Sequence, residues 1–191
     1  MLQNDPELFE LSMSEKTQPL MDLVKKHCEE NVKPIQAEYS ALQNEKEDRW
    51  SWHPRQIELM EGAKEKAKEL GLWNFFLPDP DGNIGDGLTN LDYTYVATEI
   101  GKYPLASESM NCSAPDTGNM EVLERVGTEE QKKQWLEPLL NGEIRSAYAM
   151  TEPNLASSDA KNISTSAVLD GDEWVINCLL YTSDAADDSL R

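Results

Sequence analysis

Apolar residues in the first three quarters of the chain recur with the helical period of about 3.6 residues. This spacing predicts five amphipathic helices, which begin after Pro19 and at Pro54, Asn90, Asp116 and Thr128. We expect the first helix to run toward Val32 and the other four to end at Gly71, Gly101, Gly127 and Gly142. Pro54 suits a first helical turn, Asn90 and Asp116 are predicted caps, and Thr128 opens a capping box with Gln131.

The same spacing predicts which side chains face the core. The expected buried positions are Leu20, Leu23, Val24, His27, Ile57, Met60, Ala63, Ala67, Leu70, Leu91, Tyr95, Val96, Ile100, Met120, Leu123, Val126, Trp135, Leu136, Leu139 and Leu140. His27 lies on an apolar face and is therefore interpreted as a packing residue rather than a ligand. The Lys-Glu alternation after Pro54 indicates a solvated face, and the polar stretch 39–52 predicts a connection.

After Gly142 the period changes to about 2, which predicts β-structure. A short strand is expected from Arg145 to Met150. Alternation from Ile163 to Leu169 predicts another strand, Asp170-Gly-Asp172 a turn, and Trp174-Val-Ile176 the returning strand. Trp174 is expected to pack in a core. The fold class is therefore α+β, with an all-α bundle followed by the start of a β domain.

The composition of the chain argues against two classes of binding partner. The net charge is -19, with 36 acidic against 17 basic residues, which argues against nucleic acids and anionic membranes as partners. No apolar run approaches the roughly 18 residues of a membrane span, and no signal-like segment opens the chain. Cys28, Cys112 and Cys178 lack disulfide-like spacing, so we expect small buried side chains and a cytoplasmic location. Two histidines, His27 and His53, indicate no metal site.

The stretch Arg145–Asp159 is the strongest candidate for a binding site. A strand would place Tyr148 and Met150 on one face, and the small hydroxyl residues that follow would let backbone amides approach a flat cofactor. An ordinary polar connection fits the residue types equally well.

Tyr148-Ala-Met-Thr-Glu-Pro-Asn-Leu-Ala-Ser-Ser-Asp159 resembles the flavin-binding signature of the acyl-CoA dehydrogenases. The segments from Cys112 to Leu123 and from Gly127 to Ile144 resemble one branch of that family, which is fused to kinase-like domains in animals and stands alone in bacteria. The resemblance runs from about Gly71 to Asn177. It implies a helical domain over 1–143, a partial middle β-barrel domain over 144–177, and a non-native tail over 178–191, where the family pattern stops.

The resemblance also implies residue roles toward FAD. Backbone groups of Tyr148 and Met150 would hold the pyrimidine side of the isoalloxazine, and the Thr151 hydroxyl would reach N5 or the neighbouring carbonyl. Ser158 would contact the FAD phosphates and the CoA portion of the substrate. The signature here is one residue longer than the common form, so Ser157 remains a rival. Glu152 is expected to shape the loop rather than to act as a base.

The family removes a proton alpha to an acyl-CoA thioester and passes the beta hydride to the flavin, in fatty acid oxidation. Its catalytic glutamate lies in a C-terminal helical domain, so no catalytic residue is assigned in this chain and the isolated chain is expected to be inactive. The resemblance implies an electron-transfer partner and a homo-oligomer, dimer or tetramer, at full length. An acyl-CoA oxidase fits the same residues.

A second hypothesis, from a different class, is a non-catalytic acidic helical interaction module. Its adaptable contacts would come from five methionines, Met13, Met21, Met60, Met110 and Met120.

Overall fold

The computed structural model describes residues 11–45, 48, 50–77, 87–152, 155–156 and 158–178. The chain forms two compact units, Met1–Ser146 and Ala147–Arg191. The first is helical and the second contains a two-stranded sheet, which confirms the α+β class. The domain limits 1–143, 144–177 and 178–191 stay predictions. All of the predicted tail except Cys178 lies outside the described residues.

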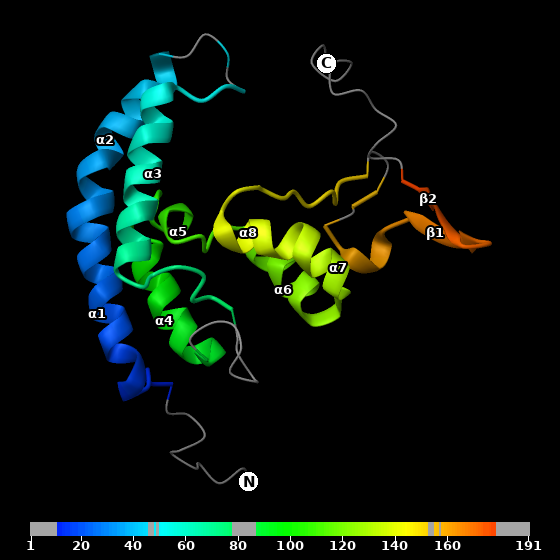
Figure 1. Cartoon of the computed structure of the whole chain (residues 1–191), viewed down its shortest axis with the longest axis horizontal. Helices are drawn as coiled ribbons and strands as arrows, with labels where there is room; N and C mark the ends of the chain where they lie inside the picture. Colours follow the sequence, from blue (N-terminus) through cyan, green and yellow to red (C-terminus); the bar gives the residue numbers. More distant parts are fainter. Residues whose placement is uncertain are drawn as a thin grey trace, which may run out of the picture. The chain divides into compact units, whose positions relative to one another are not determined.

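The first helical column is longer than the sequence pattern indicated. Helix α1 (Gln18–His27) continues through a π-helical turn (Cys28–Val32) into α2 (Lys33–Leu42), and α3 (Pro54–Glu69) packs beside α2 (Figure 1). The predicted end near Val32 and the start of a connection at Tyr39 are therefore wrong. A proline inside an α-helix meets the carbonyl four residues earlier, and the wider π-helical turn lies where Pro34 would make that contact.

A π-helical turn ahead of a proline also occurs at the end of the helical unit. The predicted fifth helix consists of α7 (Glu129–Gln131), a π-helical turn (Lys132–Leu136) and α8 (Glu137–Asn141), with Pro138 as the second residue after the π-helical turn. Its predicted capping box is confirmed. The Thr128 hydroxyl accepts from the Gln131 amide at 3.2 Å, and the Gln131 side chain accepts from the Thr128 amide at 2.9 Å.

Two of the predicted caps are wrong. Helix α4 (Asn90–Ile100) is capped by Thr89, whose hydroxyl accepts from the Asp92 amide at 3.1 Å. Helix α6 (Asp116–Val126) begins with Asp116 as its first residue, after Pro115, and the Asp116 carboxylate is bound elsewhere. The short helix α5 (Ala106–Ser109) was not predicted, because four residues are too few to show a period.

The core of the helical unit joins α1, α4, α6, α8 and the loop after α3. Its fully buried side chains include Val24, Val32, Leu72, Phe75, Leu77, Val96, Met110 and Met120. Five predicted core positions are instead exposed, and these are Leu23, Ile57, Tyr95, Val126 and Trp135. Of the methionines assigned to an interaction surface, Met21, Met60, Met110 and Met120 are buried, so that surface is not available.

His27 and two of the three cysteines are buried as the sequence predicts, whereas Cys178 is only half-buried. His27 is fully buried, and its Nε2 lies 2.9 Å from the Ser109 hydroxyl. This confirms its interpretation as a packing residue with its hydrogen bonds satisfied. Cys28 and Cys112 are buried, and burial raises the pKa of each thiol to about 12, as expected of inert small side chains.

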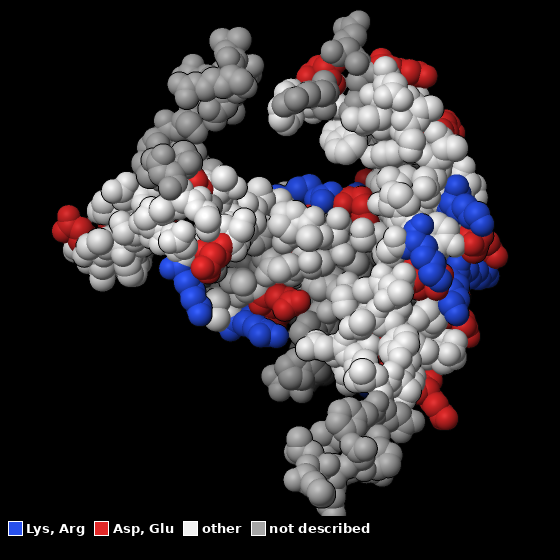
Figure 2. Space-filling model, turned by 180° about the vertical axis from the view of Figure 1, so that it is seen from behind, with Lys and Arg blue, Asp and Glu red and all other residues white. Residues whose placement is uncertain are grey.

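Charged side chains gather on the outer side of the helical column. Basic and acidic groups alternate along the edge formed by α1 to α3 (Figure 2). Lys33–Glu29, Lys66–Glu69 and Arg55–Glu38 are ion pairs of 2.6, 2.8 and 2.7 Å whose side chains are largely exposed. Their exposure confirms the solvated face. Such exposed pairs contribute little to stability.

The described part of the second unit contains a hairpin. Strands β1 (Ser166–Asp170) and β2 (Glu173–Asn177) pair antiparallel, with Asp170 opposite Glu173 and Gly171 at φ +66° in the turn. Both faces of the hairpin are exposed, and Trp174 is 65% exposed, so its predicted core packing is wrong in this chain. The described part of this unit provides no second layer. The strand predicted at 145–150 is not formed, since these residues pair with no strand among the described residues.

Gly142 and Gly62 provide a matched pair of substitutions. Gly142 ends α8 at φ +75°, where an added Cβ would lie 2.9 Å from the Trp73 ring, whereas Gly62 lies exposed inside α3 with free space around it. We expect Gly142→Ala to lower the free energy of unfolding by more than about 1 kcal/mol. Gly62→Ala should raise it by about 0.5–1 kcal/mol. Urea denaturation measures both, and equal effects of the two substitutions would contradict the prediction.

Candidate functional site

The predicted flavin-binding residues lie in a segment that belongs to neither a helix nor a ladder. Residues 147–152 are irregular, so their backbone N–H and C=O groups are not used in regular secondary structure. Tyr148, Thr151 and Ser158 are exposed and Met150 is half-buried, while Ser157 lies outside the described residues. The backbone groups and hydroxyls assigned to a ligand are thus in positions that a ligand could reach.

Glu152 closes this segment by binding the residues that lead into β1. One carboxylate oxygen accepts from the amide and hydroxyl of Ser164, at 3.0 and 2.6 Å, and the other from the amide and hydroxyl of Thr165, at 2.8 and 2.6 Å. We call this arrangement the Glu152 clamp. It joins residue 152 to residues 164–165 and so closes the loop that contains Ser158.

The Glu152 clamp is unsuited to proton abstraction. Hydrogen bonds from the side chains and amides of Ser164 and Thr165 lower the pKa of Glu152 to about 2, and the side chain is buried at 3% exposure. A base that operates near neutral pH needs a higher pKa and an accessible oxygen. The expectation that Glu152 shapes the loop is confirmed.

A small cavity lies beside the Glu152 clamp within the second unit. Its volume is about 250 Å³, and it is lined by Ala149, Met150, Glu152, Ile163, Thr165, Ile176 and Cys178. The cavity therefore brings Met150, one of the predicted flavin-binding residues, next to Ile176 of the hairpin.

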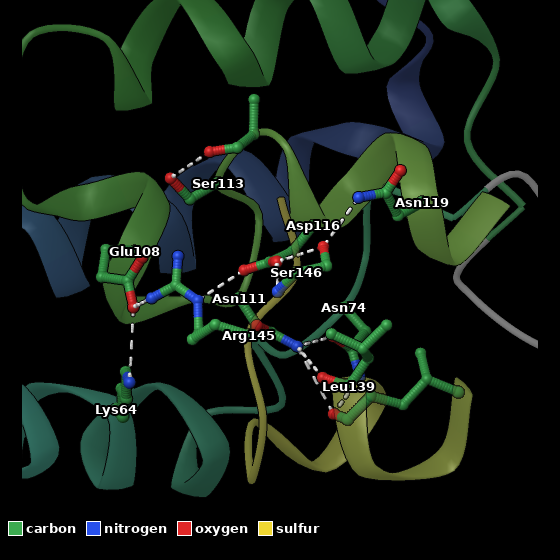
Figure 3. A network of polar contacts seen from close by, with 12 residues as sticks. Lys64, Asn74, Glu108, Asn111, Ser113, Asp116, Asn119, Leu139, Arg145 and Ser146 are labelled. Atoms are coloured by element: carbon green, nitrogen blue, oxygen red, sulfur yellow. Dashed lines mark hydrogen bonds and ion pairs between the residues drawn. The ribbon is translucent and has the colours of Figure 1, made fainter. Parts of the chain in front are cut away.

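A second acidic residue binds the chain just before this segment. Figure 3 shows Asp116, at the start of α6, facing Arg145 and Ser146. Asp116 Oδ1 accepts from the Ser146 amide at 2.7 Å and from its hydroxyl at 2.6 Å, while Oδ2 accepts from Arg145 Nε at 2.6 Å. We call this the Asp116 clamp. Asn119 adds a bond to the Ser146 hydroxyl at 2.8 Å.

The Asp116 clamp is part of a larger ion network. Arg145 also donates to Glu108 at 2.5 Å, and Lys64 of α3 lies 3.4 Å from the same Glu108 oxygen. Burial alone would raise the pKa of Asp116, but the bonds from Ser146 and the Arg145 guanidinium outweigh it and lower the pKa. For Arg145, burial opposes the charge, yet Glu108 and Asp116 hold its pKa above the ordinary value. Asp116 and Arg145 are thus both charged at neutral pH.

The helical unit contains a cleft of about 660 Å³ that is partly lined by this ion network. Its polar side includes Lys64, Glu108 and Arg145, and its apolar side includes Tyr39, Trp52, Ile57, Met60 and Leu105. The rings of Tyr39 and Trp52 pack with centroids 6.5 Å apart. Ile57, which was predicted to be buried, is exposed because it faces this cleft.

Two asparagines hold the C-terminal end of α8, directly before the Asp116 clamp (Figure 3). Asn74 and Asn111 have φ values of +60° and +55°. Asn74 donates to the Leu140 carbonyl at 2.8 Å, and Asn111 donates to the Leu139 carbonyl at 3.0 Å. Sequence reasoning missed both, although asparagine is the residue after glycine that best tolerates this backbone region.

A model of the family "Acyl-CoA dehydrogenase, N-terminal domain" matches residues 14–143. The chain belongs to the acyl-CoA dehydrogenase family. It is 49% identical over 168 residues to acyl-CoA dehydrogenase family member 10 of Mus musculus, which covers 86% of this chain and 15% of that protein. It is 53% identical over 131 residues to the probable acyl-CoA dehydrogenase FadE2 of Mycobacterium tuberculosis, covering 68% of this chain and 31% of that protein.

A solved structure agrees with the family assignment. The structure of a putative acyl-CoA dehydrogenase from Mycobacterium abscessus matches with a TM-score of 0.76 and 42% identity, over 87% of this chain and 42% of that chain. The resemblance inferred from the sequence is confirmed. The chain spans less than half the length of each of these relatives.

Among the described residues, no group of three or more His, Cys, Asp or Glu side chains is placed to hold a metal ion. Within the same residues, every helix is too short or too polar to cross a bilayer.

Proposed function

We propose that this chain is the N-terminal, flavin-binding part of an FAD-dependent acyl-CoA dehydrogenase that forms the alpha,beta double bond of acyl-CoA thioesters in fatty acid oxidation. The observation that carries the proposal is the irregular segment 147–151. Its backbone is outside helix and ladder, it precedes the Glu152 clamp, and the loop which that clamp closes contains an exposed serine.

Each residue has a defined task in this proposal. Backbone groups of Tyr148 and Met150 hold the pyrimidine side of the isoalloxazine, and the exposed Thr151 hydroxyl donates to it near N5. Ser158, or its neighbour Ser157, binds phosphate oxygens of FAD and the CoA portion. FAD, when bound, supplies the hydride-accepting chemistry. The Glu152 clamp keeps these contacts in one loop, and it removes no proton itself.

The remaining parts of the activity are proposed to lie outside this chain. The catalytic carboxylate belongs to a later helical domain, so the isolated chain is expected to be inactive. At full length we expect a cytoplasmic homo-oligomer, a dimer or tetramer, that passes electrons to a partner protein. Because the net charge of -19 repels phosphates at long range, binding depends on local amides and hydroxyls.

FAD titration of the folded chain tests the proposal. We expect one FAD per chain, quenched flavin fluorescence, and a shifted flavin absorbance band that Thr151→Ala alters. The matched control is Thr98→Ala in α4, whose hydroxyl donates only within its own helix, to the Thr94 carbonyl at 2.8 Å. A wild-type chain that stays folded but binds no FAD would refute the proposed function.

A further inference from the structure

We propose that Asp116 is a positioning residue for the flavin-binding segment. The inference rests on the proposed function and deepens it, because it names a group outside the signature on which the isoalloxazine contacts depend. Asp116 would touch neither the cofactor nor the substrate. It would act through Arg145 and Ser146, the last two residues of the helical unit.

The bonds of the Asp116 clamp hold the backbone itself. The Ser146 amide donates to Asp116 Oδ1 at 2.7 Å, and the hydroxyl of the same residue donates to the same oxygen at 2.6 Å. Tyr148 follows only two residues later, within about 7 Å of extended chain. A shift at Ser146 is therefore passed along the chain to the first backbone groups assigned to the isoalloxazine.

Helix α6 holds the Asp116 carboxylate in a fixed position. Asp116 is its first residue, where the helix dipole favours a carboxylate, and its side chain is only 4% exposed. One turn further on, Met120 is fully buried in the core and anchors the helix. The carboxylate thus has little freedom to follow a displaced Ser146.

Arg145 is fixed by the same network. Its guanidinium binds Asp116 through Nε at 2.6 Å and Glu108 at 2.5 Å, from two different helices. Charge-assisted bonds of this kind are stronger and more directional than neutral ones. Both residues that immediately precede Ala147 are therefore held by charged partners.

The two clamps lie on either side of the proposed isoalloxazine contacts in the sequence. Residues 147–151 lie between the Asp116 clamp and the Glu152 clamp, whereas Ser158 lies inside the loop that the Glu152 clamp closes. Loss of the Asp116 clamp should therefore disturb the isoalloxazine environment. The phosphate contacts should be affected much less.

The test compares Asp116→Asn with Asp92→Asn in the full chain. Asp92 is a buried aspartate in the first turn of α4 whose carboxylate accepts from the Ser14 amide at 2.8 Å and from the Thr89 hydroxyl. It therefore measures the effect of the same substitution away from the proposed site. We expect Asp116→Asn to raise the dissociation constant for FAD about tenfold and to change the visible circular dichroism of bound flavin at saturation. Asp92→Asn should lower the unfolding midpoint and leave that spectrum unchanged.

A second variant covers the case in which Asp116→Asn does not fold. Arg145→Lys replaces a side chain that is half exposed, keeps the charge and loses the planar fork, and it should weaken FAD binding and alter the same spectrum. An unchanged affinity and spectrum in the folded variants would overturn this inference alone. A wild-type chain without FAD binding would overturn the proposed function and this inference together.

Discussion

The Glu152→Ala variant is expected to bind FAD at least about tenfold more weakly than the wild type. The substitution removes both acceptor oxygens of the Glu152 clamp and leaves four donors, on Ser164 and Thr165, without their carboxylate. The loop that contains Ser158 would no longer be closed at its two ends. The phosphate contact at Ser158 and the isoalloxazine contacts at residues 148–151 would then no longer be held at fixed positions relative to each other.

Limited proteolysis measures the opening of this loop directly. Lys161 is exposed inside it, so trypsin should cleave after Lys161 faster in Glu152→Ala than in the wild type. Glu173→Ala, which removes an exposed glutamate of β2, is the matched control and should change neither cleavage nor FAD affinity. Unchanged cleavage in Glu152→Ala would show that the loop is held by other contacts.

The pH dependence of the Glu152 clamp has a definite sign. The pKa of Glu152 in the folded chain is about 2, below its ordinary value of 4.5. The folded state therefore favours the charged form, and the stabilisation is present above pH 4.5 and lost as pH falls toward 2. FAD affinity should consequently not change between pH 5 and 8 through this group.

The second large effect is a loss of stability on mild acidification, caused by His27. Its Nε2 donates to Ser109 Oγ at 2.9 Å, since the Ser109 hydroxyl hydrogen is directed to the Ala106 carbonyl at 2.8 Å. Its Nδ1 then accepts from the Asn31 side-chain amide at 3.3 Å. This pattern fits the neutral ring, and a second ring proton would point at a donor.

Burial lowers the pKa of His27 below its ordinary value of 6.5, so the unfolded state binds more protons as pH falls. The stabilisation is fully present above pH 6.5 and is lost as pH falls below it toward the folded-state pKa. The free energy of unfolding should fall by at most about 1.4 kcal/mol per pH unit in this window. Asp92 and Glu152, with pKa values of about 2, lose their contributions only below this range.

Urea denaturation between pH 5.5 and 7.5 measures this slope. His27→Gln removes the titrating ring while keeping a polar side chain, so its slope should be flatter than that of the wild type. An identical slope in the two proteins would show that another group causes the pH dependence.

The sequence alone determined the features that local spacing and backbone chemistry control. The helical period, the Thr128 capping box, the Gly142 stop and the hairpin turn at Gly171 all depend on residues a few positions apart, and each is confirmed. The first helix was predicted to end near Val32, whereas α2 continues it to Leu42, because the π-helical turn Cys28–Val32 that accommodates Pro34 has no distinct sequence pattern. The family signature likewise depends on adjacent residues, so it was found without the fold.

Only the tertiary structure decided which side chains meet across long separations. The Asp116 clamp joins residues 29 and 30 positions apart, and the Glu152 clamp joins residues 12 and 13 apart. Likewise, spacing shows which side of a strand or helix is apolar but not whether another element covers it, so Ile57 and Trp174 were wrongly placed in a core. Burial and carboxylate pairing arise from packing between elements, which a local pattern does not encode.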